Sequence, residues 1–148
     1  GVALDGLPSR LTGVDLSSAM LERAKATGAY QDFLHLDLVA ALNTLPEGSA
    51  EAAIAADVLV YVGVLELVFA EVRRVLADNG MFIATFEESQ NIEGWELSSA
   101  GRYLHTEDYL RKVAADAVMD VISISCTFLR EEYEVPVPSI VAAFEKRR

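Results

Sequence analysis

The chain has 148 residues, of which 52% are hydrophobic, and this length and composition fit one globular domain and exclude a disordered chain. The net charge of −11 argues against DNA or RNA as the main partner, because phosphate binding needs clustered Lys and Arg side chains. Cys126 is the only cysteine, so no disulfide can form within the chain, and a reducing, cytoplasmic location fits. The apolar run 52–70 contains Asp57 and Glu66, whose charges disfavour a membrane span.

Three short strands, each followed by a helix, are expected in the first half of the chain. The strands are expected at residues 11–15, 30–36 and 52–56. Ser17 or Ser18 caps the first helix and Gly28 ends it, and a short helical stretch at 39–45 follows the second strand. The third helix, 64–76, has the clearest pattern, because its apolar residues recur at the spacing of one helix face.

The next part of the chain is expected to contain a strand, a long loop and a helix. The strand is expected at 81–86. The polar stretch 87–102 contains the only tryptophan, Trp95, and is interpreted as a loop of the kind that often forms a lid. Thr106 caps the last helix.

Two strands, 121–130 and 140–144, are expected to end the fold as an antiparallel pair, because a short segment joins them. Cys126 is expected on the apolar face of the first of them, and the basic end 146–148 is expected to be a solvated tail. The order of elements therefore predicts an α/β fold with a mostly parallel sheet and an antiparallel edge, formed by residues 1–148 as a single domain.

Three carboxylates, Asp15, Asp37 and Asp57, each fall at the C-terminal end of a predicted strand. In open α/β sheets the ligand crevice lies outside the C-terminal ends of the strands, so these side chains are candidates for ligand binding. The alternative for Asp15 and Asp57 is that each merely caps the element that follows it. His35 and His105 lie far apart in sequence, and metal ligation needs three or four convergent ligands, so no metal site is expected.

Five segments of the sequence resemble those of a known protein family. They are LTGVDLSSAMLERA at 11–24, HLDL at 35–38, AADVLVYV at 55–62, EVRRVLADNGMF at 71–82 and GRYLHTEDY at 101–109. With these segments the chain resembles the class I S-adenosylmethionine-dependent methyltransferases, and in particular small bacterial methyltransferase domains that are often fused to tetratricopeptide repeats. The resemblance implies a Rossmann-like fold, S-adenosylmethionine as cofactor and methyl transfer to a small-molecule acceptor.

The resemblance also implies which residues hold the adenosine part of the cofactor. Asp15 would bind both ribose hydroxyls, because a carboxylate can accept from two donors. Leu16 and Met20 would pack against the adenine. Asp37 would accept a hydrogen bond from the adenine amino group, and Leu38 would offer its backbone N–H.

By the same resemblance, Ala56, Asp57 and Tyr61 would line the methionine end of the cofactor and the mouth of the acceptor pocket. Methyl transfer is an in-line displacement that needs alignment more than a dedicated catalytic group, so no catalytic residue is assigned.

The sequence departs from the family at its start. The family's first strand and its Gly-x-Gly-x-Gly turn would lie just before residue 1, so we expect an N-terminally truncated domain with a gap in its sheet. A gap would expose unpaired strand edges, which makes a homodimer plausible. Two other functions stay open: a truncated, non-catalytic interaction module, and a nicotinamide-dependent oxidoreductase, which fits Asp15 but fits the final antiparallel strand pair poorly.

Overall fold

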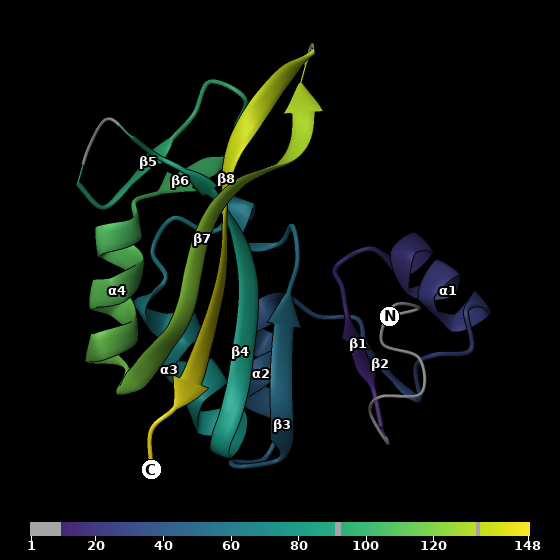
Figure 1. Cartoon of the computed structure of the whole chain (residues 1–148). Coiled ribbons are helices and arrows are strands. Elements are labelled where there is room, and N and C mark those ends of the chain that lie inside the picture. The colour runs from purple at the N-terminus through teal and green to yellow at the C-terminus, as the bar shows by residue number, and fades with distance from the viewer. Residues whose placement is uncertain (1–9, 91–92, 133) are drawn as a thin grey trace. The chain divides into compact units, whose positions relative to one another are not determined.

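The computed structural model describes residues 10–90, 93–132 and 134–148, and it falls into two compact units, Gly1–Leu45 and Pro46–Arg148. We call them the N-terminal unit and the C-terminal unit and describe each by itself. Figure 1 shows the elements of both units.

The N-terminal unit is a parallel strand pair with two helices. Its elements are β1 (Thr12–Val14), α1 (Ser18–Ala26), β2 (Asp32–Leu34) and α2 (Leu38–Thr44). The backbone N–H of Asp15 donates to the carbonyl of Leu34 at 3.2 Å, which extends the strand pairing by one residue. Ser17 caps α1, because its side chain accepts from the N–H of Met20. The predicted order of strand, helix, strand and helix is therefore confirmed here.

The C-terminal unit contains one six-stranded sheet, in which β8 lies between β4 and β7 and β3 pairs with the other edge of β4. The strands are β3 (Ala50–Ala55), β4 (Leu76–Glu88), β5 (Trp95–Leu97), β6 (Tyr103–His105), β7 (Met119–Glu132) and β8 (Val135–Lys146). The pairs β3–β4 and β4–β6 are parallel, whereas β4–β8, β5–β6 and β7–β8 are antiparallel.

This sheet is mixed rather than mostly parallel, which corrects the sequence prediction. β8 pairs antiparallel with β7, the strand that precedes it in the chain, and it also runs antiparallel to β4. Both strands are also longer than expected, which lengthens the antiparallel part of the sheet. The predicted antiparallel pairing of the last two strands is confirmed.

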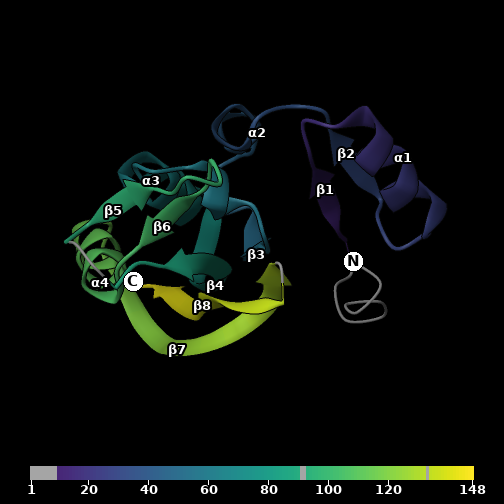
Figure 2. The ribbon, with the colours of Figure 1, turned by 90° about the horizontal axis from the view of Figure 1, so that it is seen from above.

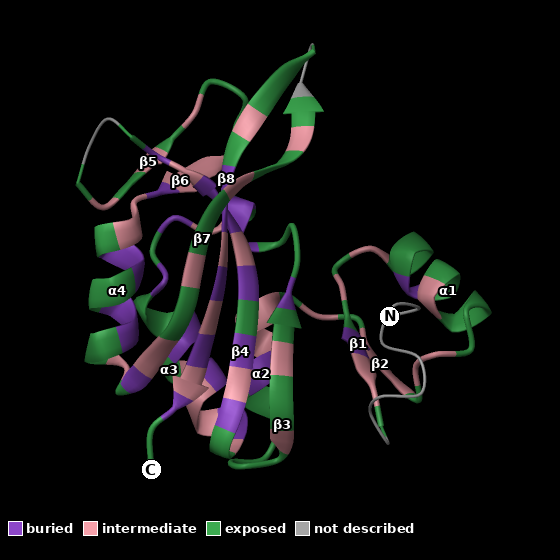
Figure 3. Cartoon of the chain, in the orientation of Figure 1, coloured by how far each residue is buried: buried purple, intermediate pink, exposed green. Residues whose placement is uncertain are grey.

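Helices α3 (Glu66–Val75) and α4 (Glu107–Asp116) bury one face of this sheet (Figure 2). Along β4, buried residues alternate with more exposed ones, as the colours of the ribbon in Figure 3 show. Phe69 of α3 meets Phe82 of β4 and Phe144 of β8 edge-to-face, with ring centroids 5.4 and 5.0 Å apart. None of the helices in the described part of the chain is long and apolar enough to cross a membrane.

The predicted loop 87–102 is partly wrong, because β4 extends to Glu88 and β5 lies within this stretch. β5 pairs with β6, and Trp95 packs against Tyr103 with ring centroids 5.3 Å apart. Strands of three residues pair through their backbones, so their side-chain pattern is too short to reveal them in the sequence.

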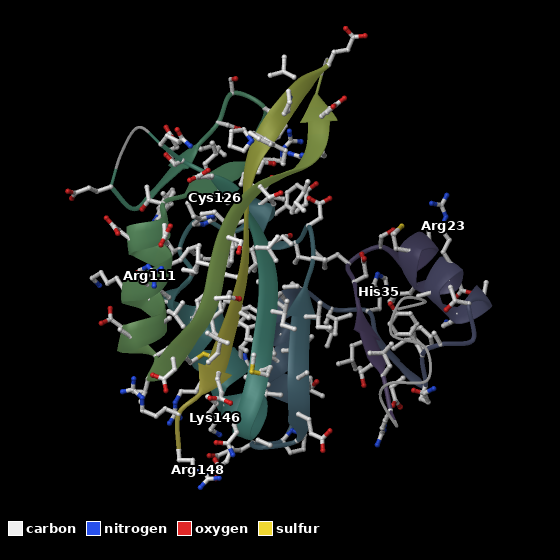
Figure 4. All side chains as sticks on the ribbon, viewed as in Figure 1. Arg23, His35, Arg111, Cys126, Lys146 and Arg148 are labelled. Atoms are coloured by element: carbon white, nitrogen blue, oxygen red, sulfur yellow. The ribbon has the colours of Figure 1, made fainter. Side chains whose placement is uncertain are left out.

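Two expectations for the last strands are wrong. Cys126 is exposed and not part of the core: it pairs with the buried Ile140, but among the described strands β7 pairs only with β8, so it lies at the edge of the sheet. Lys146 is buried at the end of β8 and donates to the carbonyl of Leu76 at 2.7 Å, so it is no part of a solvated tail. Figure 4 shows Cys126 and Lys146 far apart along the β7–β8 pair.

Candidate functional site

Asp15 directly follows β1, and part of its carboxylate is available for further hydrogen bonds. Its Oδ1 accepts from the N–H of Ser17 at 2.7 Å, which fixes the turn into α1. Ser17, and not Asp15, is the N-cap of that helix. A carboxylate can accept several hydrogen bonds, so Asp15 keeps the capacity to bind further donors.

Two apolar side chains next to Asp15 are exposed. Leu16 is 70% exposed and Met20 is 48% exposed. The backbone of Leu16 is nevertheless held in place, because Nε2 of His35 donates to its carbonyl at 2.8 Å. No local pattern in the sequence indicates this contact, which links the loop after β2 to the loop after β1. The result is a fixed loop that presents apolar side chains beside a carboxylate.

Asp37 and Leu38 stand at the start of α2. Oδ1 of Asp37 accepts from the N–H of Ala40 at 2.9 Å, so Asp37 is the N-cap of this helix. Leu38 is the first helical residue, and its N–H has no acceptor within the helix. Because β1 and β2 are parallel, Asp15 and Asp37 lie at the same edge of the strand pair. The N-terminal unit thus brings together all five residues predicted to hold adenosine.

The other three predicted residues belong to the C-terminal unit, where Ala56 and Asp57 follow β3 and Tyr61 ends the short 3-10 helix η2 (Leu59–Tyr61). Asp57 has φ 57°, in the left-handed region that Asp tolerates better than most residues. Its N–H donates to Oγ1 of Thr85 at 2.9 Å. The side chains of Asp57 and Tyr61 are 72% and 67% exposed, and Asp57 caps no helix.

Asp57 lines a pocket of about 180 Å³ together with residues from η2, β4, β7 and β8. Glu87, in the wall of this pocket, is buried and forms ion pairs with Arg130 and with Arg102, whose Nε lies 2.7 Å from Oε1. Nη1 of Arg130 also lies 3.9 Å from Oδ1 of Asp57. Two guanidinium groups thus compensate the burial of one carboxylate and give the pocket a polar wall.

This ion-pair cluster was not predicted from the sequence. The only available signals were a carboxylate directly after the strand 81–86 and a basic residue at the end of the strand 121–130. In the described residues, no group of three or more His, Cys, Asp or Glu side chains could hold a metal ion.

A family model described as "Methyltransferase domain" matches residues 2–84, which is more than half of the chain. No curated protein sequence matches the chain.

Several solved structures share the fold. A S-adenosylmethionine-dependent methyltransferase from Methanosarcina mazei is 16% identical, with a TM-score of 0.70, and the match covers 92% of this chain and 81% of that one. The 1,6-didemethyltoxoflavin-N1-methyltransferase of Burkholderia thailandensis, solved with 1,6-didemethyltoxoflavin and S-adenosylhomocysteine, is 17% identical, with a TM-score of 0.73 and coverage of 94% and 62%. The magnesium protoporphyrin IX methyltransferase of Synechocystis PCC 6803, solved with S-adenosylmethionine, is 18% identical, with a TM-score of 0.71 and coverage of 99% and 64%. At these identities the likeness shows the fold alone.

Proposed function

Because the chain belongs to the class I S-adenosylmethionine-dependent methyltransferase family, we propose that it binds S-adenosylmethionine and transfers a methyl group to a small-molecule acceptor. The observation that best supports this proposal is the set of groups at the C-terminal edge of the β1–β2 pair. There Asp15 retains acceptor capacity beside the exposed side chains of Leu16 and Met20, and the N–H of Leu38 has no helical acceptor. A carboxylate, an apolar surface and a backbone donor are the groups that a nucleoside needs.

In this proposal each residue of the N-terminal unit binds one part of the adenosine. Asp15 accepts hydrogen bonds from the two ribose hydroxyls, while Ser17 and His35 hold the surrounding loop. Leu16 and Met20 cover the adenine ring. Asp37 accepts from the adenine amino group with the oxygen that does not cap α2, and Leu38 donates its N–H to a ring nitrogen.

The C-terminal unit supplies the remaining contacts in the proposal. S-adenosylmethionine, when bound, supplies an electrophilic methyl group on its sulfonium sulfur. Ala56, Asp57 and Tyr61 line the methionine end and the mouth of the pocket, and their role is to align an acceptor rather than to react with it. A small-molecule acceptor agrees with the relative that was solved with 1,6-didemethyltoxoflavin.

The strands β1 and β3 each have an edge without a strand partner in the described part of the chain. Among the described residues, β1 pairs only with β2, and β3 pairs only with β4, so each has one edge without a strand partner. We propose that residues 1–148 belong to a single methyltransferase domain with a Rossmann-like fold. Unpaired edges recruit other strands, so they also favour a homodimer. The low cysteine content favours the cytoplasm.

A second candidate function is a non-catalytic methyltransferase-like interaction module. It is favoured by the edges of β1 and β3 that have no strand partner among the described residues, because such edges can pair with another chain. Cofactor binding separates the two functions, since the interaction module needs none.

The experiment is calorimetric titration with S-adenosylhomocysteine. We expect micromolar binding, which Asp15→Asn should weaken by about 1–3 kcal/mol, or roughly 5–150-fold, because the amide keeps the contact with Ser17 but loses an acceptor. Asp32→Asn is the matched control: Asp32 starts β2, at the opposite edge, and pairs with Arg10 at 2.6 Å, so this variant should bind like the wild type. Absence of binding by the wild type would favour the interaction module, and equal loss in both variants would refute the role of Asp15.

A further inference from the structure

A buried histidine holds the loop that leads from the pocket to α3. His105, at the end of β6, is fully buried, and its Nε2 lies 3.1 Å from the carbonyl oxygen of Gly63. A carbonyl can only accept, so Nε2 carries the proton and Nδ1 is an acceptor. Nδ1 is buried and has no hydrogen-bond partner among the described residues.

Tyr109 of α4 extends this contact along the same loop. Its ring stacks on His105 with centroids 5.9 Å apart and an interplanar angle of 9°. Its hydroxyl accepts from the N–H of Leu65 at 3.0 Å and donates to Oε2 of Glu66 at 2.8 Å. Burial, with a further contribution from Glu66, raises the pKa of Tyr109 to about 12, so the hydroxyl stays protonated and keeps both bonds.

Two aromatic rings of the β5–β6 hairpin pack against the same loop at Gly63. A Cβ atom added to Gly63 would lie 2.7 Å from the ring of Tyr103 and 2.9 Å from the ring of Trp95. Only glycine therefore lets the backbone lie this close to the two rings. His105, Tyr109, Tyr103 and Trp95 together fix the backbone from Gly63 to Glu66.

The other end of this segment is fixed as well. The N–H of Asp57 donates to Thr85, and Leu59 and Val60 are buried between the two fixed ends. The segment 57–65 therefore presents Asp57 and Tyr61 to solvent from a backbone that is held at both ends.

We propose that His105 is a positioning residue, which fixes the segment 57–65 through its hydrogen bond to Gly63 and so sets the place of Asp57 and Tyr61. The role in methyl transfer rests on the function proposed above, but the effect on the segment does not. A histidine that served only to fill the core would be better replaced by an apolar ring, because the imidazole leaves Nδ1 unpaired in the interior. Its bond to Gly63 is the contact that an apolar ring cannot make.

The test uses Trp95, the only tryptophan, as a reporter that already contacts Gly63. His105→Phe keeps a ring against Tyr109 but removes the donor, whereas the side-chain amide of His105→Gln can still donate to Gly63. We expect His105→Phe to shift Trp95 emission and to speed amide hydrogen exchange in residues 62–66 by about tenfold or more. His105→Gln should restore both readouts towards those of the wild type.

Val113→Ala is the control for destabilisation alone, because Val113 is buried on α4 and the change removes only apolar volume. It should leave Trp95 emission at the wild-type value. Wild-type emission and exchange in His105→Phe, or an equal emission shift in Val113→Ala, would overturn the proposal.

A measurement on the unaltered chain keeps the proposal testable if His105→Phe does not fold. The ¹⁵N shifts of the His105 ring should report the tautomer with its proton on Nε2, and that proton should exchange slowly. A proton on Nδ1 would contradict the proposal. Titration with S-adenosylhomocysteine then tests the link to function: His105→Phe should bind about tenfold or more weakly and His105→Gln should recover. A wild type that does not bind would refute the proposed function and leave the result for the segment standing.

Discussion

Gly63→Ala is the substitution that tests the packing of the loop most severely. The new Cβ would lie 2.7 Å from Tyr103 and 2.9 Å from Trp95, closer than carbon atoms approach in folded proteins. The φ angle of Gly63 lies outside the left-handed region, so alanine meets no backbone strain there and the cost comes from the two rings. Overpacking of this kind costs about 1–3 kcal/mol. For a chain of this length the thermal midpoint should fall by about 2–12 °C.

Thermal and denaturant unfolding, followed by circular dichroism, measure this cost. The double variant Gly63→Ala/Tyr103→Ala separates the cause, because the two shortest contacts of the new methyl group involve the Tyr103 ring. In the Tyr103→Ala background, the added cost of Gly63→Ala should fall by at least half. A Gly63→Ala variant as stable as the wild type, or a cost that is the same in both backgrounds, would refute this account of the loop.

Two further predictions concern α4 and its neighbour β6. Thr106→Ala should lower the free energy of unfolding, measured in urea, by about 1 kcal/mol, because the Thr106 hydroxyl accepts from the N–H of Tyr109 at 3.2 Å and caps the helix. Thr106→Ser keeps the hydroxyl and should recover most of this lost stability. Burial lowers the pKa of His105 below its usual value of about 6.5, and this effect outweighs the carbonyls of Gly63 and Val62, which raise the pKa. As the pH falls below 6.5, the unfolded chain binds this proton first, so stability should decrease until the pH passes the folded-state pKa. In His105→Gln, the free energy of unfolding should depend less on pH between pH 7.5 and 5.5. An unchanged pH dependence would contradict a lowered pKa at His105.

Local signals predicted much of the fold. The caps Ser17 and Thr106 were predictable because a capping side chain binds a backbone group within three residues of itself. The helix 66–75 followed from its apolar spacing. The hairpin of β5 and β6 was not predicted, because its three-residue strands lie in or beside the polar stretch 87–102 and show too little of an alternating pattern to be recognised.

The candidate site likewise contains residues that local sequence patterns predict and contacts that they do not predict. Asp15, Asp37 and Asp57 were predicted because each falls at the C-terminal end of a predicted strand, and strand ends are readable in the sequence. The contact of Glu87 with Arg130 joins residues 43 positions apart, and the contact of His105 with Gly63 joins residues 42 apart, so neither leaves a local pattern. The exposure of Cys126 goes with the place of β7 at the edge of the sheet, and the order of strands in a sheet cannot be read from a regular alternation.

The measurement that tests the central claim most directly is an NMR titration of the ¹⁵N-labelled chain with S-adenosylhomocysteine. The account predicts that the largest amide shifts occur at residues 15–20 and 37–38, with a second group at 56–61, and that Asp15→Asn reduces them at matched ligand concentration. Saturable shifts that leave residues 15–20 and 37–38 unaffected, or no shifts at millimolar ligand, would contradict it.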